Sequence, residues 1–190
     1  MKVRRSYEKE VKKFQVGDQI QVGKYTATCV LIKGTKATFL LDQYLDKAFM
    51  HYNLLENLNA FIKKDKNFKE INKIAIPICK LNDGTNAKYR VPYAGDMFSG
   101  TSEDQWIRTF CEPDTKNGFL DVWPCMRNRR NRLADGEIED YRWGWLMNKL
   151  KNKFQDPIPV FTVVTNSGDA VGYNSCDSNS VRPVFVISQD

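Results

Sequence analysis

The sequence predicts an α+β domain with short antiparallel strands, two or three helices and long loops. Near both ends of the chain, apolar residues alternate with polar ones, which is the period of a half-buried strand. Over residues 46–64 they recur every three or four residues, which is the period of a helix face. The chain has 190 residues, the length of one compact domain, and contains no apolar run long enough to predict a membrane span. We therefore expect one soluble domain over residues 14–190, preceded by a basic arm over residues 1–13.

A β-meander is expected at the start of the domain. Its strands are predicted over residues 19–22, 26–32 and 37–41, where apolar side chains alternate with polar ones. Turns that begin at Gly23 and Gly34 separate them, because glycine adopts the backbone conformations that tight turns require. We expect these three strands to form one antiparallel sheet.

The period changes after the meander. Residues 46–64 contain no glycine or proline and predict an amphipathic helix. Alternating isoleucines over residues 74–78 predict a short strand, and Pro77 places it at a sheet edge because proline cannot donate a hydrogen bond to a neighbouring strand. The sheet is expected to continue over residues 89–92. The apolar face of the helix is formed by Tyr52, Leu55, Leu58 and Ile62.

The second half begins with a short helix and then loses regularity. A capping-box pattern at Ser102 precedes Trp106 and Phe110, which are spaced as on one helix face. Residues 111–142 are interrupted by glycines and prolines and predict a long loop, of the kind that carries function or docking surfaces. The remaining strands are expected over residues 160–164, 170–173 and 184–187.

Charge and rare residues narrow the function. The net charge is +6, and much of it comes from the arm, whose basic residues include Arg4, Arg5, Lys12 and Lys13. Such an arm is typical of a segment that docks on a subunit, of one that binds nucleic acid, or of a solvated tail. The five cysteines are widely spaced and the chain has a single histidine. This pattern predicts no disulfide framework, no metal site and no cofactor, and it argues against hydrolytic enzymes.

Residues 173–180 are the predicted ligand-binding loop. Short polar side chains beside an aromatic ring bind a sugar or a protein epitope, because amides and hydroxyls pair with polar groups while the ring stacks on an apolar face. A solvated turn is the alternative, and calcium held by Asp169 and Asp177 would lack a dense carboxylate cluster. The candidate ligand-binding residues of this loop are Tyr173, Asn174, Ser175, Asp177 and Asn179.

Two tryptophans are further ligand-binding candidates. Trp143 and Trp145 stand two residues apart, so in an extended segment their rings point to opposite faces. One ring would then lie in the core while the other contacts a ligand. The alternative places both rings in the core, which is the commoner environment of tryptophan.

A run of arginines lies in the long loop, between Trp123 and Tyr141. Guanidinium groups pair with phosphates and aromatic rings stack on bases, which is the chemistry of nucleic-acid binding. The acidic residues that follow nearly cancel the charge, which favours a salt-bridged loop or a subunit contact. The arginines predicted to dock on a partner are Arg127, Arg129, Arg130 and Arg132.

Five short motifs follow one another along the chain: Val16-Gly17-Asp18, Leu58-Asn59 with Phe61, Val91-Pro92 with Asp96-Met97-Phe98, Trp143-Gly144-Trp145-Leu146 and Val181-Arg182-Pro183. In this order they resemble an uncharacterised domain family common in phage and bacterial surface proteins. Members look like C-type-lectin folds related to formylglycine-generating enzymes, so the resemblance implies a single C-type-lectin-like domain whose late loops form the binding face. The chain departs from the family where Met147-Asn148 follows the tryptophan motif in place of an Arg-Ser pair.

The resemblance, together with the absence of an apolar export signal after the basic residues, predicts a non-enzymatic phage virion protein assembled in the host cytoplasm. It would dock on other virion proteins, contact host glycans and form an oligomer, without membrane insertion. The alternative is an intracellular phage protein that binds a host macromolecule or nucleic acid through its arginines. A third hypothesis is an oxidoreductase of the formylglycine-generating type, which would need Cys176 and a second cysteine such as Cys125 nearby.

Overall fold

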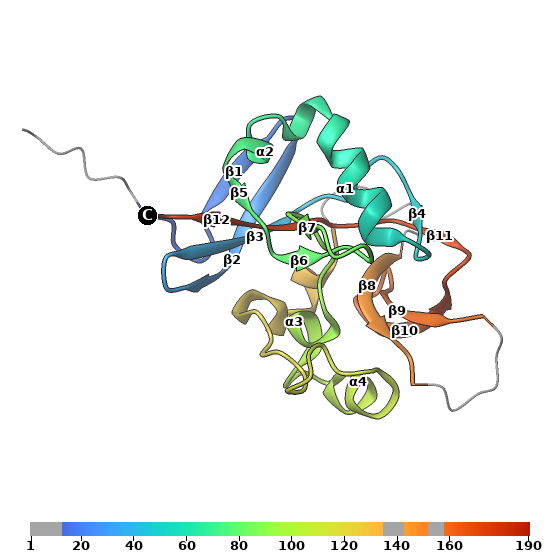
Figure 1. The fold of residues 1–190 in the computed structure, drawn as a ribbon. Coiled ribbons are helices and arrows are strands. Elements are labelled where there is room, and N and C mark those ends of the chain that lie inside the picture. Colours follow the sequence, from blue (N-terminus) through green and yellow to red (C-terminus); the bar gives the residue numbers. More distant parts are fainter. Residues whose placement is uncertain (1–12, 135–142, 152–157) are drawn as a thin grey trace, which may run out of the picture.

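Antiparallel strands and short helices alternate along the chain (Figure 1). The computed structural model describes residues 13–134, 143–151 and 158–190. In this part of the chain every pairing between named strands is antiparallel. The predicted mixture of helices with mainly antiparallel strands is thus confirmed. Within the same ranges, the helices are all too short or too polar to cross a membrane.

A five-stranded sheet has the order β1-β2-β3-β12-β5. The meander supplies its first three strands as predicted, and the turns between them contain Gly23 and Gly34, both with a φ of 60° that favours glycine. The last strand of the chain is inserted beside β3, so the two ends of the described chain meet in one sheet. The strands are β1 (Gln19–Val22), β2 (Tyr25–Lys33), β3 (Lys36–Leu41), β12 (Val184–Ser188) and β5 (Ala75–Ile76).

The other strands form a three-stranded sheet and two isolated pairs. The sheet has the order β10-β9-β8, while β11 pairs with β4 and β6 pairs with β7. The predicted strands near residues 160–164 and 170–173 are confirmed as β9 and β10. These strands are β8 (Gly144–Lys149), β9 (Val160–Val164), β10 (Ala170–Asn174), β4 (Phe49–Met50), β11 (Ser178–Asn179), β6 (Cys79–Lys80) and β7 (Asn86–Ala87).

Helices cover the five-stranded sheet. The described residues hold four α-helices and three short 3₁₀ helices, which is more than the two or three helices predicted. The α-helices are α1 (Leu54–Lys64), α2 (Ile71–Ile74), α3 (Ala94–Phe98) and α4 (Asp104–Phe110). The 3₁₀ helices are η1 (Lys66–Phe68), η2 (Pro124–Arg127) and η3 (Arg129–Arg132).

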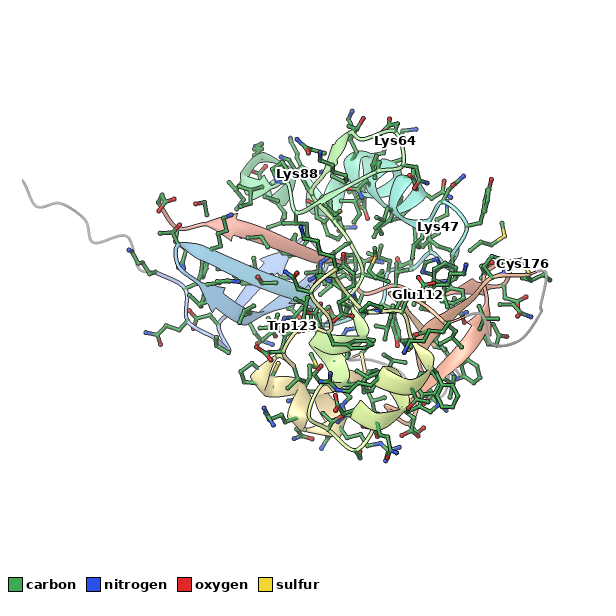
Figure 2. All side chains as sticks on the ribbon, turned by 60° about the horizontal axis from the view of Figure 1, so that its bottom comes forward. Lys47, Lys64, Lys88, Glu112, Trp123 and Cys176 are labelled. Atoms are coloured by element: carbon green, nitrogen blue, oxygen red, sulfur yellow. The ribbon has the colours of Figure 1, made fainter. Side chains whose placement is uncertain are left out.

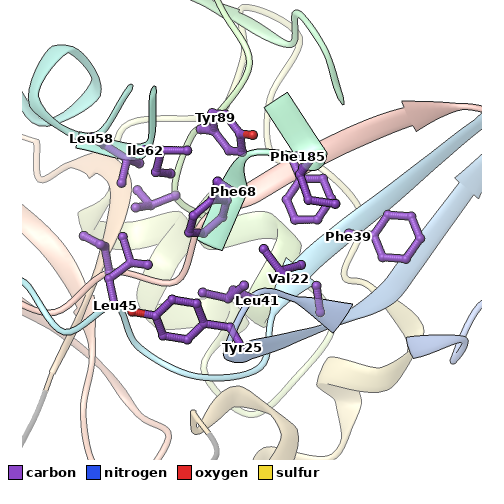
Figure 3. Packing of buried hydrophobic residues seen from close by; sticks show 14 of the residues in the cluster. Val22, Tyr25, Phe39, Leu41, Leu45, Leu58, Ile62, Phe68, Tyr89 and Phe185 are labelled. Carbon is purple, nitrogen blue, oxygen red and sulfur yellow. The ribbon is translucent and has the colours of Figure 1, made fainter. Parts of the chain in front are cut away.

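Two apolar cores lie on the two faces of this sheet. Alternate residues of a strand point to opposite faces, so Leu40 belongs to one core while Phe39 and Leu41 belong to the other. The core around Leu40 contains Trp123, labelled in Figure 2, and includes buried residues of α3 and η2. The core around Phe39 contains the buried face of α1, and Figure 3 shows Leu58 and Ile62 of that face with Phe68 and Tyr89.

Two predicted element boundaries are wrong, and the strand expected over residues 89–92 is reduced to a single bridge between Arg90 and Val184. The helix expected from residue 46 begins at Leu54, because β4 occupies part of the preceding segment and Asn53 has a left-handed φ of 52°. Tyr52 therefore lies outside the helix, with 74% of its surface exposed. The strand expected over residues 74–78 is shortened to β5 by α2, although β5 does lie at the sheet edge, as Pro77 predicted.

Candidate functional site

An open groove of about 1120 Å³ lies between α1 and the segment that contains β4. Its lining comes from residues 24–25, residues 46–50, one face of α1, residues 65–67 and Ser178. The volume exceeds that of a typical pocket for a small molecule, so the groove has room for an extended ligand. Figure 1 shows α1 running beside β4 and β11.

The sequence of α1 builds one wall of the groove. Leu54, Leu58 and Ile62 are buried in the core, which fixes the rotation of the helix. The neighbouring face then presents Asn57, Phe61 and the other groove residues of the helix at spacings of three and four positions. This wall is thus a direct consequence of the amphipathic pattern.

The second wall is held in place by the late part of the chain. β11 pairs with β4, so that Ser178 stands opposite Met50 and Asn179 opposite Phe49. The indole N–H of Trp145 donates a 2.6 Å hydrogen bond to the carbonyl oxygen of Phe49, and this bond is buried. The second wall is thereby tied to the core, to which Trp145 and Phe49 both belong.

Aromatic rings and lysine stems give the groove an apolar floor. The rings of Phe49 and Phe61 meet edge to face with centroids 5.7 Å apart. The ammonium group of Lys47 lies 5.5 Å and 5.6 Å from the two centroids, a distance at which a cation attracts an aromatic face. Met50 is 52% exposed and adds a flexible apolar side chain.

The charges of the groove do not balance. Lys24 forms an ion pair with Asp46, and the hydrogen bond between them raises the pKa of the lysine. The carboxylate of Asp65 accepts two hydrogen bonds from Asn67, at 2.9 Å and 2.8 Å. Within the described ranges three further lysines of the lining, Lys47, Lys64 and Lys66, have no ion-pair partner. Figure 2 shows Lys47 and Lys64 on the α1 side of the molecule.

Six other charged and polar residues are buried or half-buried, and we call them together the buried polar junction: Arg90, Asp96, Asp114, Asn148, Glu103 and Arg132. Asp114 accepts hydrogen bonds from the backbone N–H groups of Gly95 and Leu120 and from the amide of Asn148. Burial raises the pKa of Asp114. Every group of this junction has a partner, so its chemistry is that of a structural element.

The residues of the predicted ligand-binding loop differ in their exposure to solvent. Asn174 and Asp177 are exposed, whereas Ser175 is buried and its carbonyl oxygen accepts a 2.9 Å hydrogen bond from the backbone N–H of His51. Asn179 is half-buried, and its side-chain nitrogen has no hydrogen-bond partner in the part of the chain that the structure describes. The loop reaches the groove only through Ser178.

The predicted ligand-binding tryptophans differ in burial: Trp145 lies in the core, and Trp143 packs against it. Trp145 is 1% exposed, and half-buried Trp143 packs edge to face on Tyr173 with centroids 5.1 Å apart. Tyr173 also contacts Trp145, at 6.2 Å. The structure therefore places all three aromatic residues together, with one tryptophan buried and the other partly exposed, and contact of Trp143 with a ligand stays a prediction.

His51 fastens the loop to the three-stranded sheet. Its ring stacks on Phe161 with centroids 3.5 Å apart, and its Nε2–H donates a 2.9 Å hydrogen bond to the carbonyl oxygen of Leu146. Burial lowers the pKa of this histidine to about 4. A neutral imidazole with its Nε2 engaged in this way is a packing element.

The arginines predicted to dock on a partner also differ in exposure and ion pairing. Arg127 and Arg130 are exposed, and Arg129 is paired with Asp169. Arg132 is only 2% exposed; its NH1 donates to Glu103 at 2.6 Å, so the expectation that it faces a partner is wrong. Lys13 is exposed, while Arg4, Arg5 and Lys12 lie outside the described residues.

The cysteines and carboxylates are dispersed. All five cysteines are free, with Cys176 exposed and Cys125 half-buried. Burial raises the pKa of Cys125, which disfavours its thiolate. In the described ranges no three histidines, cysteines or carboxylates are grouped so that they could hold a metal ion.

Comparison with protein families, with curated proteins and with solved structures finds no match to this chain. The site is therefore defined by its own geometry.

Sequence reasoning missed the groove itself. Its lysines come from separate segments between residues 24 and 66, and the helical period predicts residues 46–50 as part of a helix, whereas they contain β4. One feature of the sequence does point to the groove. Asn57, Phe61 and Lys64 share the helix face beside the buried one, and a phenylalanine is unexpected on such a polar, solvent-facing surface.

Proposed function

We propose that the protein is a non-enzymatic binding module with a C-type-lectin-like fold, that it docks on other proteins of a phage virion, and that the groove is its docking site. The observation that carries the docking site is the set of unpaired lysines, Lys47, Lys64 and Lys66, above an apolar floor. Surface lysines gathered over aromatic and methionine side chains are suited to a complementary partner.

Docking on a protein fits the groove better than contact with a glycan. A sugar is usually bound by stacking on an exposed aromatic face. Here Phe49 is buried, and the ammonium of Lys47 lies over the rings of Phe49 and Phe61. The virion assignment rests on the sequence resemblance, and the groove supplies a surface on which such a protein would dock.

The test measures the amount of the protein in purified particles of the phage that encodes it. Quantitative mass spectrometry would compare wild type with the groove variant, Lys47→Glu with Lys64→Glu and Lys66→Glu. The control variant is Lys33→Glu with Lys63→Glu and Lys69→Glu, which reverses three exposed lysines outside the groove. Both variants change the net charge equally, and each reverses one lysine in the last turn of α1.

We expect wild type and control variant in particles at the same fixed ratio to the major capsid protein, and a loss of about tenfold for the groove variant. Absence of the wild type from particles would overturn the virion assignment. Equal incorporation of the groove variant would overturn the groove as docking site.

A further inference from the structure

We infer that the partner segment held in the groove is an extended peptide in which acidic and apolar residues alternate, and that it adds a strand to β4. This inference rests on the proposed function and specifies the chemistry of its partner. Three observations carry it: the position of the β4 edge, the charge of the groove, and the apolar floor.

The edge of β4 borders the groove. Successive residues of a strand point to opposite faces, yet both residues of β4, Phe49 and Met50, line the groove, as do residues 46–48 that precede them. An arrangement of this kind places the edge of the strand at the groove. β4 pairs with β11 along one edge, and the sheet order gives it no second neighbour among the described residues. An extended peptide can therefore add its backbone hydrogen bonds along the other edge.

The positive charge of the groove favours a peptide with acidic residues. The ion pair between Lys24 and Asp46 is neutral as a whole, and Asp65 is held by Asn67. The remaining charges of the lining are the ammonium groups of Lys47, Lys64 and Lys66 and the single carboxylate of Asp65, so the lining is positive as a whole. In an added strand, every second side chain of the peptide would face one side of the groove, so carboxylates at alternate positions would meet these lysines.

The apolar floor of the groove favours apolar residues at the peptide positions between the acidic ones. Phe61 and Met50 are partly or half exposed at the groove surface, and Ala48 and Ala60 leave space between the larger side chains. Methionine adapts to side chains of different shape, which is suited to binding a peptide. An alternating peptide would bury its apolar side chains here while its acidic side chains stay near the lysines.

Nucleic acid fits these observations less well. A single strand binds through stacked bases and a continuous positive groove. In the groove, Phe49 is buried and the ammonium group of Lys47 lies over the rings of Phe49 and Phe61, so these rings offer no free face on which bases could stack.

The experiment uses the whole protein and dye-labelled probes in fluorescence anisotropy. The first probe is a pool of short peptides that alternate glutamate with apolar residues. The second pool replaces glutamate with lysine, and the third keeps glutamate but carries N-methyl groups at alternate backbone amides, which prevents strand pairing. Oligothymidine and oligogalacturonate serve as nucleic-acid and acidic-sugar probes. Amide hydrogen exchange of residues 46–50 is followed by NMR with and without the glutamate pool.

We expect the glutamate pool to bind at least about tenfold more tightly than every other probe, including the N-methylated pool. The groove variant should lose this binding by about tenfold, while the control variant keeps it within about twofold. Exchange of the amides near Ala48 should slow in the complex.

Equal binding of the lysine pool, or tighter binding of oligothymidine or oligogalacturonate, would overturn the acidic peptide. Equal binding of the N-methylated pool, or unchanged amide exchange, would overturn strand addition. The inference also fails if no peptide pool binds. A protein that docks in particles through its groove, yet ignores the glutamate pool, would keep the proposed function and lose only this inference.

Discussion

The groove and the buried polar junction contain similar residue types but use them in opposite ways. In the junction, the guanidinium of Arg132 is 2% exposed and is bonded to Glu103, and Arg90 is bonded to Asp96 at 2.9 Å. In the groove, Lys64 and Lys66 are exposed and have no ion-pair partner in the described ranges.

The effect of a charged side chain thus depends on its burial and its ion-pair partner more than on its residue type. A buried charge whose partner is removed destabilises the fold, because the remaining group is left in a medium of low polarity. A solvated charge without a partner contributes little to stability and remains available to a ligand. The junction should therefore respond to mutation through folding, and the groove through binding.

The largest expected effect is on the junction. Arg132→Met should lower the free energy of unfolding by about 3–5 kcal/mol, because the carboxylate of Glu103 would lose its buried partner. Arg130→Met, in the same arginine run but exposed, should change it by less than about 0.5 kcal/mol. Urea denaturation measures both. Equal effects of the two substitutions would contradict the finding that Arg132 is buried and paired while Arg130 is exposed.

His51 makes the stability of the protein depend on pH. Its pKa of about 4 in the folded protein lies below the ordinary value of 6.5, so the unfolded chain binds the proton more tightly. The contribution of this histidine to stability is fully present above pH 6.5 and is lost as the pH falls towards 4, by about 3 kcal/mol. Comparing urea unfolding of wild type and His51→Gln between pH 7 and pH 4 isolates it, and a constant difference would refute the burial.

The two tryptophans provide a smaller effect. Trp145→Phe removes the buried hydrogen bond to Phe49 and should cost about 2 kcal/mol. Trp143→Phe, at a half-buried ring, should cost about 1 kcal/mol or less. Thermal unfolding with a chemical-denaturant check gives both values. A smaller cost at Trp145 than at Trp143 would be inconsistent with the packing described for these rings.

Local patterns in the sequence predicted much of the fold. The meander, the turns at Gly23 and Gly34 and the edge position of β5 follow from periodicity, glycine conformation and the missing N–H of Pro77. The start of α1 did not, because residues 46–53 have no glycine or proline to end a helical pattern. Their structure depends on pairing with β11, which lies more than a hundred residues away in the chain.

The candidate site was less predictable than the fold. A sequence shows that arginines and tryptophans are present, but their burial is decided by distant groups, such as Glu103 for Arg132 and the Phe49 carbonyl for Trp145. The groove lysines come together only when the β1–β2 turn, β4 and α1 pack against one core. Only Ser178 connects the predicted loop to the groove.

The smallest effect on stability is expected at the groove. The groove variant and the control variant should each change the free energy of unfolding by about 1 kcal/mol or less, since exposed lysines contribute little and both variants reverse a lysine at the end of α1. Urea denaturation of the two proteins side by side measures this. A much larger loss in the groove variant would mean that its lysines stabilise the fold.

Docking through the groove is tested most directly by the content of these two variants in purified particles. We expect the control variant to be incorporated like wild type and the groove variant, although folded, to be lost by about tenfold. Incorporation of all three proteins at the same ratio to the major capsid protein would contradict the claim that the groove is the docking site.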